Sequence, residues 1–323
     1  MSQPLANVVL VDNEQTSSRL NPTQERTLGL LRRPSEPVVF DRDQISSFIS
    51  DFSDAFDHLT ARVTALETTL FISKGMLTSV LGCEEHFQEK EEFRWSVPTA
   101  IGTVAHRAIE LLTGWRGAPY PATLVDESIA RLGEKPNSLG DFLSAMTEGD
   151  RADLRNAATD RVVKFTESFP PLQQSFIPVA ESSIRWPETG PIVLGGKSDL
   201  TLGRAEHGES RKVIIDLKTG GAWPNHMDEL RFYALLETLR TGIPPRLIAG
   251  FYLDAGRAVP EEVTIETLGS AMRRTLDGIG RAVELLEGRA AVRRPQSSCR
   301  WCPLASDCVD GTTWLEEQSA ERD

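Results

Sequence analysis

The sequence predicts an α/β fold whose core order is helix, three strands, helix, strand. First, helical patterns fill residues 102–168, and Pro170-Pro171 ends them. Second, short runs rich in β-branched and other apolar residues follow, bounded by glycines. Third, a helical pattern separates the third run from the fourth. An αβββαβ core with helices before and after it is therefore expected.

The strands and helices of this core can be placed by residue number. The expected strands are 177–184, 192–202, 213–217 and 246–253, and the second is interrupted at Gly195-Gly196. The expected helices around them are 225–240 and 264–286.

An amphipathic pattern precedes the core. Apolar residues recur at steps of three and four over residues 41–70: Ile45, Phe48, Phe52, Phe56, Leu59, Val63, Leu66 and Leu70. Such a stripe is compatible with a coiled-coil seam, but packing against the rest of the chain is favoured for so short a run. A shorter helix is expected over residues 22–31, with Asn21 as its N-cap.

The chain is expected to have a main domain with extensions. Residues 1–70 form an N-terminal helical extension, of which 1–24 are mostly irregular, and residues 71–310 form the main domain. Within it, residues 116–170 are a helical insertion with helices near 122–133, 138–147 and 150–168. Residues 311–323 are an acidic tail.

The composition is ordinary for a globular protein, with 40% hydrophobic and 25% charged residues among 323. No apolar run is long enough for a membrane helix. The start, Met-Ser-Gln-Pro-Leu-Ala, lacks a basic segment followed by an apolar core, so a cytoplasmic location is expected. The net charge of −12 argues against a nucleic-acid coat protein. Six arginines within 271–294 allow a local basic face.

The stretch Arg211–Gly220 carries the first chemical signal. Val213, Ile214 and Ile215 lead directly into Asp216, and Lys218 follows. Alternate strand residues share a face, so Asp216 and Lys218 project to the same side. Taken alone, the pair is more often a salt bridge than a metal ligand beside a phosphate-binding cation.

Two further residues favour a metal site over a simple salt bridge. Asp199 lies on the preceding expected strand and His106 on the first core helix. Facing residues on neighbouring strands lie about 5 Å apart, and two buried carboxylates repel unless a cation holds them. Oxygen ligands favour Mg²⁺ or Mn²⁺, and an imidazole favours Mn²⁺. His106, Asp199 and Asp216 are therefore the candidate metal ligands, with Lys218 beside them.

Four motifs follow one another along the chain: Gly102-x-x-x-His106, Gly196-Lys-Ser-Asp199, Asp216-Leu-Lys218 and Glu229-Leu-Arg-Phe-Tyr233. In this order they resemble the motifs of the PD-(D/E)XK nuclease superfamily. The order is similar to that of the RecB and AddB nuclease domains and the CRISPR-associated adaptation nucleases, over about residues 71–310. The resemblance implies a restriction-endonuclease-like fold with a mixed sheet and a DNA substrate.

The resemblance also implies roles for single residues. His106, Asp199 and Asp216 bind the metal, Lys218 completes the catalytic set, and Tyr233 helps to place DNA. Glu229 stands where the family has glutamine, so its carboxylate either repels DNA or binds a second metal. For Tyr233 the alternative is a core tyrosine. Glu181 matches an acidic position of this branch, and the alternative is a solvent-facing residue.

The cysteines form a second signal. Cys299, Cys302 and Cys308 follow the pattern Cys-x₂-Cys-x₅-Cys, and Cys83 is the only other cysteine. Four thiolates suit either a zinc ion or an iron–sulfur cluster. One cysteine before the nuclease core and three after it is similar to AddB-type proteins, which implies a 4Fe–4S cluster. Such a cluster would close a loop of the chain as a staple.

The resulting expectation is a metal-dependent DNA nuclease with an iron–sulfur cluster, an exonuclease or flap nuclease acting on single strands or ends in DNA repair, recombination or defence. The chain has no phosphate-binding loop of a helicase, so a helicase or ATPase partner would be a separate chain. The alternatives are a catalytically impaired DNA-end scaffold, suggested by Glu229 and the acidic charge, and a zinc-stapled interaction module.

Overall fold

The computed structural model describes residues 20–89, 93–117, 119–134, 138–223 and 225–321. Most of the stretch predicted to be irregular, residues 1–19, and the last two residues of the predicted tail lie outside this range. The chain forms two compact units, each assembled from segments far apart in sequence. Unit 1 comprises residues up to 42, 94–184 and 197–264, and unit 2 comprises residues 43–93, 185–196 and those from 265 onward. The domain boundaries at residues 70 and 310 stay a prediction.

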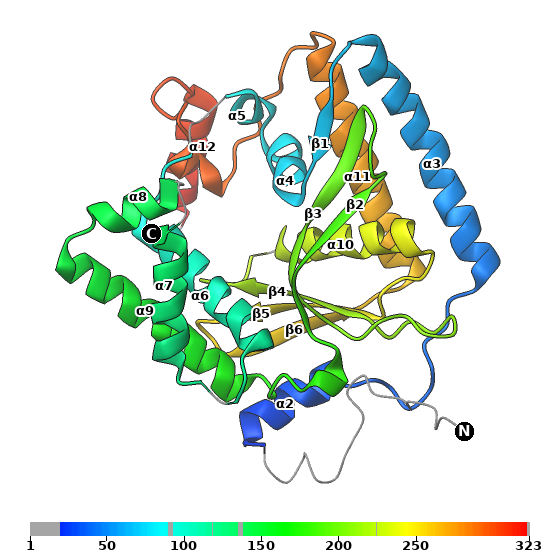
Figure 1. The fold of residues 1–323 in the computed structure, drawn as a ribbon. Coiled ribbons are helices and arrows are strands. Elements are labelled where there is room, and N and C mark those ends of the chain that lie inside the picture. The colour runs from blue at the N-terminus through cyan, green and yellow to red at the C-terminus, as the bar shows by residue number, and fades with distance from the viewer. Residues whose placement is uncertain (1–19, 90–92, 118, 135–137, 224, 322–323) are drawn as a thin grey trace. The chain divides into compact units, whose positions relative to one another are not determined.

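Unit 1 carries the predicted core. Its helices are α2 (Pro22–Leu31), α6 (Val97–Gly114), α7 (Pro121–Glu134), α8 (Ser138–Ala145), α9 (Glu148–Ser168), the short η1 (Gln174–Phe176) and α10 (Asn225–Thr241). Its strands are β4 (Val213–Lys218), β5 (Leu247–Tyr252), β6 (Arg257–Glu262), most of β2 (Val179–Trp186) and the second half of β3 (Ile192–Leu202) (Figure 1).

The sheet of unit 1 is mixed, as predicted. Its order is β3, β4, β5, β6, and β2 pairs with β3. β3 and β4 are antiparallel, β4 and β5 parallel, and β5 and β6 antiparallel. Parallel neighbours need a crossover connection, which α10 supplies between β4 and β5. The order αβββαβ is thereby confirmed.

Helices cover both faces of this sheet. Val213, Ile215 and Leu217 of β4 are buried in one cluster with α6, α7 and α9. Asp216 and Lys218 lie on the opposite face, where α10 packs against β4 and β5. One face is therefore apolar core, and the other carries charge at the strand end.

Unit 2 contains the helices α3 (Arg42–Ala65), α4 (Lys74–Gly82), α5 (Glu84–Gln88), α11 (Ile265–Leu286), η2 (Ser297–Trp301) and α12 (Val309–Ala320), and the strand β1 (Leu70–Ile72) (Figure 1). β1 pairs in parallel with the first residues of β3. α4 packs against α11 at Gly278, where an added Cβ would lie 2.5 Å from a methyl carbon of Leu77. A glycine at 278 therefore permits the close helix contact.

The apolar stripe predicted near the N-terminus is a packing surface. Five of its members are buried: Ile45, Phe48, Phe52, Phe56 and Val63. The rings of Phe52 and Phe56 contact Trp186 within unit 2, at centroid distances of 5.4 and 5.0 Å. The helix ends at Ala65, five residues before the predicted end. Glu67 adopts a positive φ of 51°, and Leu70 begins a strand instead.

Other expectations also needed correction. β3 runs unbroken through Gly195-Gly196, although an interruption was expected there. β6 was not among the predicted strands. Its Pro260 is tolerated because β6 is an edge strand, where Pro260 is the register partner of Ala249. α12 occupies most of the predicted acidic tail. Among the described helices, none has both the length and the apolar character needed to span a bilayer.

The aromatic cluster of unit 1 provides a test of the core. Phe169 stacks on Phe165 and meets Phe251 edge-on, with centroids 4.8 and 5.4 Å away. We expect Phe169→Ala to lower the free energy of unfolding by about 3–5 kcal/mol, because it removes a buried ring and leaves a cavity. Tyr120→Ala, at an exposed tyrosine, is the control and should change it by less than about 0.5 kcal/mol. Urea denaturation measures both; equal losses would contradict the packing.

Candidate active site

The paired ladder between β3 and β4 ends at a pair of aspartates. Its last paired residues are Leu200 and Ile215, and Asp199 and Asp216 are the next residues along the two strands. The Asp199 carboxylate accepts a hydrogen bond from the Leu217 backbone N–H at 2.6 Å. The Asp199 side chain thus accepts a backbone N–H that lies beyond the last pair of the ladder. Two carboxylates, predicted from the strand pattern, therefore lie at one strand end.

His106 reaches this strand end from α6. The helix begins after Ser96, whose hydroxyl accepts the Thr99 N–H. One turn before His106, Gly102 allows close approach, since an added Cβ would lie 3.3 Å from the Thr219 hydroxyl. The His106 Nδ1 lies 3.4 Å from Asp199 Oδ1. The spacing Gly-x-x-x-His thus brings the imidazole to the carboxylates.

The charge around His106 is predominantly negative. Burial by itself lowers the pKa of His106, but hydrogen bonding to Asp199 and the charge of that carboxylate raise it. Asp216 and Glu181 raise it further, and the net result is a pKa above the ordinary value. The site therefore favours a positive charge near the imidazole.

Lys218 lies between two carboxylates. Its Nζ is 2.7 Å from Asp216 Oδ2 and 2.6 Å from Glu229 Oε2. Asp216 is only 1% exposed, so an uncompensated charge there would be costly. The predicted contact between Asp216 and Lys218 is present. Glu229, the departure from the family pattern, lies on α10 and is paired with the same ammonium.

Tyr233 and Glu181 both contact Lys197 on β3. Tyr233 is 2% exposed, and its hydroxyl donates to the Lys197 carbonyl at 2.5 Å. The Glu181 carboxylate accepts from the Lys197 ammonium at 3.0 Å. Tyr233 therefore fixes α10 to β3, in agreement with the core-tyrosine alternative.

The sequence predicted no role for three residues at this edge of the sheet: Tyr252, His226 and Asp254. Tyr252 is the register partner of Lys218 on β5, and its hydroxyl lies 3.2 Å from His226 Nδ1. Burial raises the pKa of Tyr252, opposed by the nearby Lys218 charge. Asp254 accepts the Gly220 N–H and pairs with Arg161 at 3.0 Å.

The neighbourhood of Tyr252 and Lys218 could have been found from the sequence, because pairing the predicted strands 213–217 and 246–253 in parallel aligns their ends. Asp254 could not have been found in this way. Its contacts depend on the loop after β4, where Gly220 has a φ of +93°, and on a helix far away in sequence.

The donor chemistry at the strand end suits a divalent cation, because it consists of carboxylate oxygens and one imidazole. The side chains are, however, engaged with one another: Asp199 with a backbone N–H and Asp216 with Lys218. Within the part of the chain that the structure describes, no three His, Cys, Asp or Glu side chains form a preorganised metal-ion site. A cation at this site would compete with Lys218 for the Asp216 carboxylate.

A family profile matches most of this chain. The profile, described as PD-(D/E)XK nuclease superfamily, matches residues 76–309. The chain belongs to the PD-(D/E)XK nuclease superfamily. It is therefore a nuclease of the restriction-endonuclease-like α/β class, as the mixed sheet and its flanking helices indicate.

Two solved structures are similar over much of this PD-(D/E)XK chain. One is named “Putative exonuclease”, from Eubacterium rectale, with 14% identity, a TM-score of 0.43 and coverage of 71% of this chain and 87% of that one. The other is the protein SSO0001, with 14% identity, a TM-score of 0.28 and coverage of 73% and 95%. No curated protein sequence matches the chain.

The four cysteines of this nuclease meet in unit 2. Cys83, Cys299, Cys302 and Cys308 line one cavity of about 100 Å³. All four are free thiols of intermediate exposure. Burial raises the pKa of Cys302, and the other three cysteines raise it further, as expected for neighbouring thiols. The four cysteines thus line one cavity, but among the described residues their side chains do not form a group that could hold a metal ion as they stand.

Backbone groups around this cavity are directed at sulfur. The Gln296 N–H lies 3.3 Å from Cys299 Sγ, and the Gly311 N–H lies 3.4 Å from Cys308 Sγ. A Cβ at Gly311 would approach both sulfurs, at 3.3 and 3.5 Å. Amide donors and a missing side chain leave the sulfurs accessible from the cavity, a setting that fits thiolate ligands.

The lysine between two carboxylates gives a testable prediction. We expect Lys218→Met to lower the free energy of unfolding by about 3 kcal/mol without added metal, because it leaves Asp216 beside Glu229 with no cation. Mn²⁺ should restore part of this loss by binding the freed carboxylates. Thermal and chemical denaturation with and without Mn²⁺ measure both effects.

Lys197→Met is the matched control, because the side chain of Lys197 is 60% exposed and pairs with Glu181 at the surface. It should cost no more than about 1 kcal/mol. Equal losses for the two variants would show that Lys218 does not compensate a buried pair.

Proposed function

We propose that the chain is a metal-dependent deoxyribonuclease that hydrolyses phosphodiester bonds at DNA ends or in single strands. The observation that carries the proposal is the meeting of His106, Asp199, Asp216 and Lys218 at the end of the β3–β4 ladder. An acidic strand end of this kind does not attract a phosphate by itself. A cation must be bound there first, and nucleases of this superfamily generally depend on a bound metal ion.

The proposed ligands of Mg²⁺ or Mn²⁺ are His106, Asp199 and Asp216. Their oxygens and imidazole suit these ions in kind. A bound ion supplies positive charge where negative charge develops on the phosphate. Asp199 remains oriented through the Leu217 N–H, so the strand backbone fixes one ligand.

Lys218 is the proposed catalytic cation. In the structure its ammonium is held by Asp216 and Glu229 together. If a cation takes over the Asp216 carboxylate, the ammonium keeps Glu229 as its anchor and is free to hydrogen-bond a phosphate oxygen or the attacking water. Glu229 is then an orienting group for Lys218 and its charge is neutralised locally, which supports activity rather than repulsion of DNA.

Tyr233 is proposed as a positioning residue. Its hydroxyl donates to the Lys197 carbonyl, two residues before Asp199. Through this hydrogen bond α10 holds the β3 segment that carries Asp199. Lys197 is mostly exposed, so its ammonium is available to a DNA backbone in exchange for Glu181.

For the cysteines we propose a 4Fe–4S cluster rather than zinc. Four thiolates around one zinc ion close to about 2.3 Å and leave no central space. The four cysteines line a cavity of about 100 Å³, and the arrangement of one cysteine before the nuclease core and three after it supports the cluster by resemblance.

The setting of the enzyme is also part of the proposal. Four free cysteines gathered around one cavity suit a reducing compartment, the cytoplasm. The resemblance suggests a separate helicase or ATPase as the source of single strands.

The decisive test is cleavage of labelled single-stranded, duplex and flapped DNA with Mg²⁺ or Mn²⁺. We expect Asp216→Asn to reduce the rate by about 100-fold or more, because it removes a ligand charge at the strand end. Glu229→Gln, which restores the family residue, should retain cleavage. Asp126→Asn is the control, since Asp126 pairs with Arg155 at the surface of unit 1.

Equal cleavage by the wild type and Asp216→Asn would refute the proposed site. DNA binding without any cleavage, by both the wild type and Glu229→Gln, would instead identify a DNA-end scaffold.

The cofactor proposal is tested by elemental analysis after anaerobic purification. A 4Fe–4S cluster predicts about four iron and four sulfide per chain and broad visible absorbance. Cys302→Ser should abolish both, because the cluster loses a ligand. About one zinc per chain and no iron would overturn the cluster and support the zinc alternative.

A further inference from the structure

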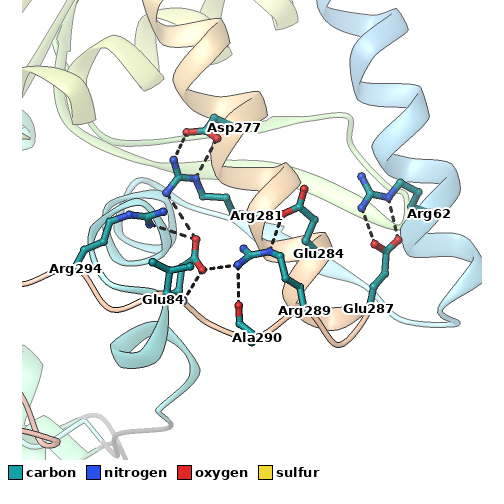
Figure 2. Close-up of polar contacts among 10 residues, drawn as sticks. Arg62, Glu84, Asp277, Arg281, Glu284, Glu287, Arg289, Ala290 and Arg294 are labelled. Carbon is teal, nitrogen blue, oxygen red and sulfur yellow. Dashed lines mark hydrogen bonds and ion pairs between the residues drawn. The ribbon is translucent and has the colours of Figure 1, made fainter. Parts of the chain in front are cut away.

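Unit 2 contains a buried carboxylate, Glu84, that plays no part in the proposed active site. Glu84 is 1% exposed. Its Oε2 lies 2.9 Å from Arg289 Nη1, and its Oε1 lies 3.2 Å from Arg294 Nη1. Arg281 lies 3.7 Å away. Figure 2 shows these guanidinium groups converging on Glu84.

The backbone adds two contacts at the same residue. The Val292 N–H donates to the Glu84 carboxylate at 2.9 Å, and the Glu84 N–H donates to the Val292 carbonyl at 3.2 Å. Glu84 is therefore bound to one residue of the 289–294 segment through both its side chain and its main chain. Four groups from a distant part of the sequence hold the Glu84 side chain, and a fifth, the Val292 carbonyl, holds its backbone N–H.

The position of this network links it to the cysteines. Glu84 directly follows Cys83, and the 289–294 segment leads through Gln296 into Cys299. On the other side of Cys83, Gly82 lies so close to Gln296 that an added Cβ would be 2.7 Å from its amide nitrogen. The two chain segments that carry the cysteines are therefore in contact on both sides of Cys83.

The arginines of residues 271–294 are thus largely occupied with acids. Arg281 also pairs with Asp277, Arg289 with Glu284, and Arg293 with Glu85 and Asp310. Four of the six arginines that the sequence suggested as a basic face thus take part in ion pairs with acidic side chains, namely Arg281, Arg289, Arg293 and Arg294. The ion pairs of Glu84 with Arg289 and Arg294, at 2.9 and 3.2 Å, place its carboxylate between cationic partners.

We propose that Glu84 is a positioning residue for the cysteine site. It docks the segment with Cys83 onto the segment with Cys299, Cys302 and Cys308 through protein contacts alone. The two segments that carry the thiols are then already in contact before a metal group binds, and ligand binding does not have to bring them together. The proposal rests on the proposed role of the four cysteines as ligands.

Loss of the Glu84 charge should have a specific effect. In Glu84→Gln the volume is kept, but Arg281, Arg289 and Arg294 lose their common anion and repel one another. Cys83 then moves relative to the other three thiols. An exposed ion pair nearby offers a matched control: Arg62 and Glu287 pair at 2.6 Å, and Glu287 is 37% exposed (Figure 2).

The experiment uses the full chain, reduced and free of metal, well below its unfolding temperature. The first readout is the rate at which the four thiols react with a disulfide reagent. The second is the affinity for Co²⁺, followed by the absorbance of cobalt–thiolate bonds. We expect Glu84→Gln to raise the thiol rate about tenfold and to weaken Co²⁺ binding by about 10- to 100-fold, as for other groups that orient ligands. Glu287→Gln should change neither.

Two further arms keep the test decisive. If Glu84→Gln does not fold, Arg294→Gln is tested in its place, because this variant leaves Glu84 paired with Arg289 and Val292. Arg294→Gln should weaken Co²⁺ binding by a smaller factor than Glu84→Gln. Unchanged thiol reactivity and Co²⁺ affinity in a folded Glu84→Gln chain, or in Arg294→Gln, would overturn the positioning role. If the wild type binds neither Co²⁺ nor iron, the ligand role of the cysteines fails, while the thiol rates still report whether Glu84 docks the two segments.

Discussion

The burial of Asp216 next to Asp199 is the constraint on which the rest of unit 1 depends. A carboxylate that is almost fully buried must have a positive partner or give up its charge. Lys218 is that partner in the structure, and it is held there by Glu229 on α10. The ladder between β3 and β4 ends where the two carboxylates begin, and α6 places His106 against one of them. Each neighbouring element thus contributes one polar group to this strand end.

Part of this site could be predicted from local periodicity, because alternation along β4 places Asp216 and Lys218 on one face. The meeting of His106 with the two aspartates was expected from the order of the motifs and its resemblance to a nuclease family. Local periodicity alone does not tell how such distant segments meet. The contact between Lys218 and Glu229 was not predicted, because it requires the packing of α10 on the sheet. The roles of Asp254 and Arg161 depend in the same way on a loop and a distant helix.

Edges and ends of elements were harder to predict for a similar reason. Pro260 lowers the strand signal of β6, yet an edge strand has a free side on which a missing N–H does no harm. Gly195-Gly196 suggested a break in β3, because glycine is flexible and weakens a strand. In the fold β3 is continuous, and it pairs with the neighbouring strands β1, β2 and β4. The arginines between residues 271 and 294 read as a basic face. Only the fold reveals that acidic side chains such as Glu84 and Asp277 face them.

The way in which unit 2 is assembled affects how the chain is made. Leu77 of α4 packs at Gly278 of α11, about two hundred residues later. At a synthesis rate of about 5–20 residues per second, the apolar face of α4 emerges roughly 10–40 seconds before its partner. During that interval unit 2 cannot close, whatever the state of the sheet in unit 1. Nascent chains therefore pass through a period in which α4 and the thiol of Cys83 are without their final neighbours.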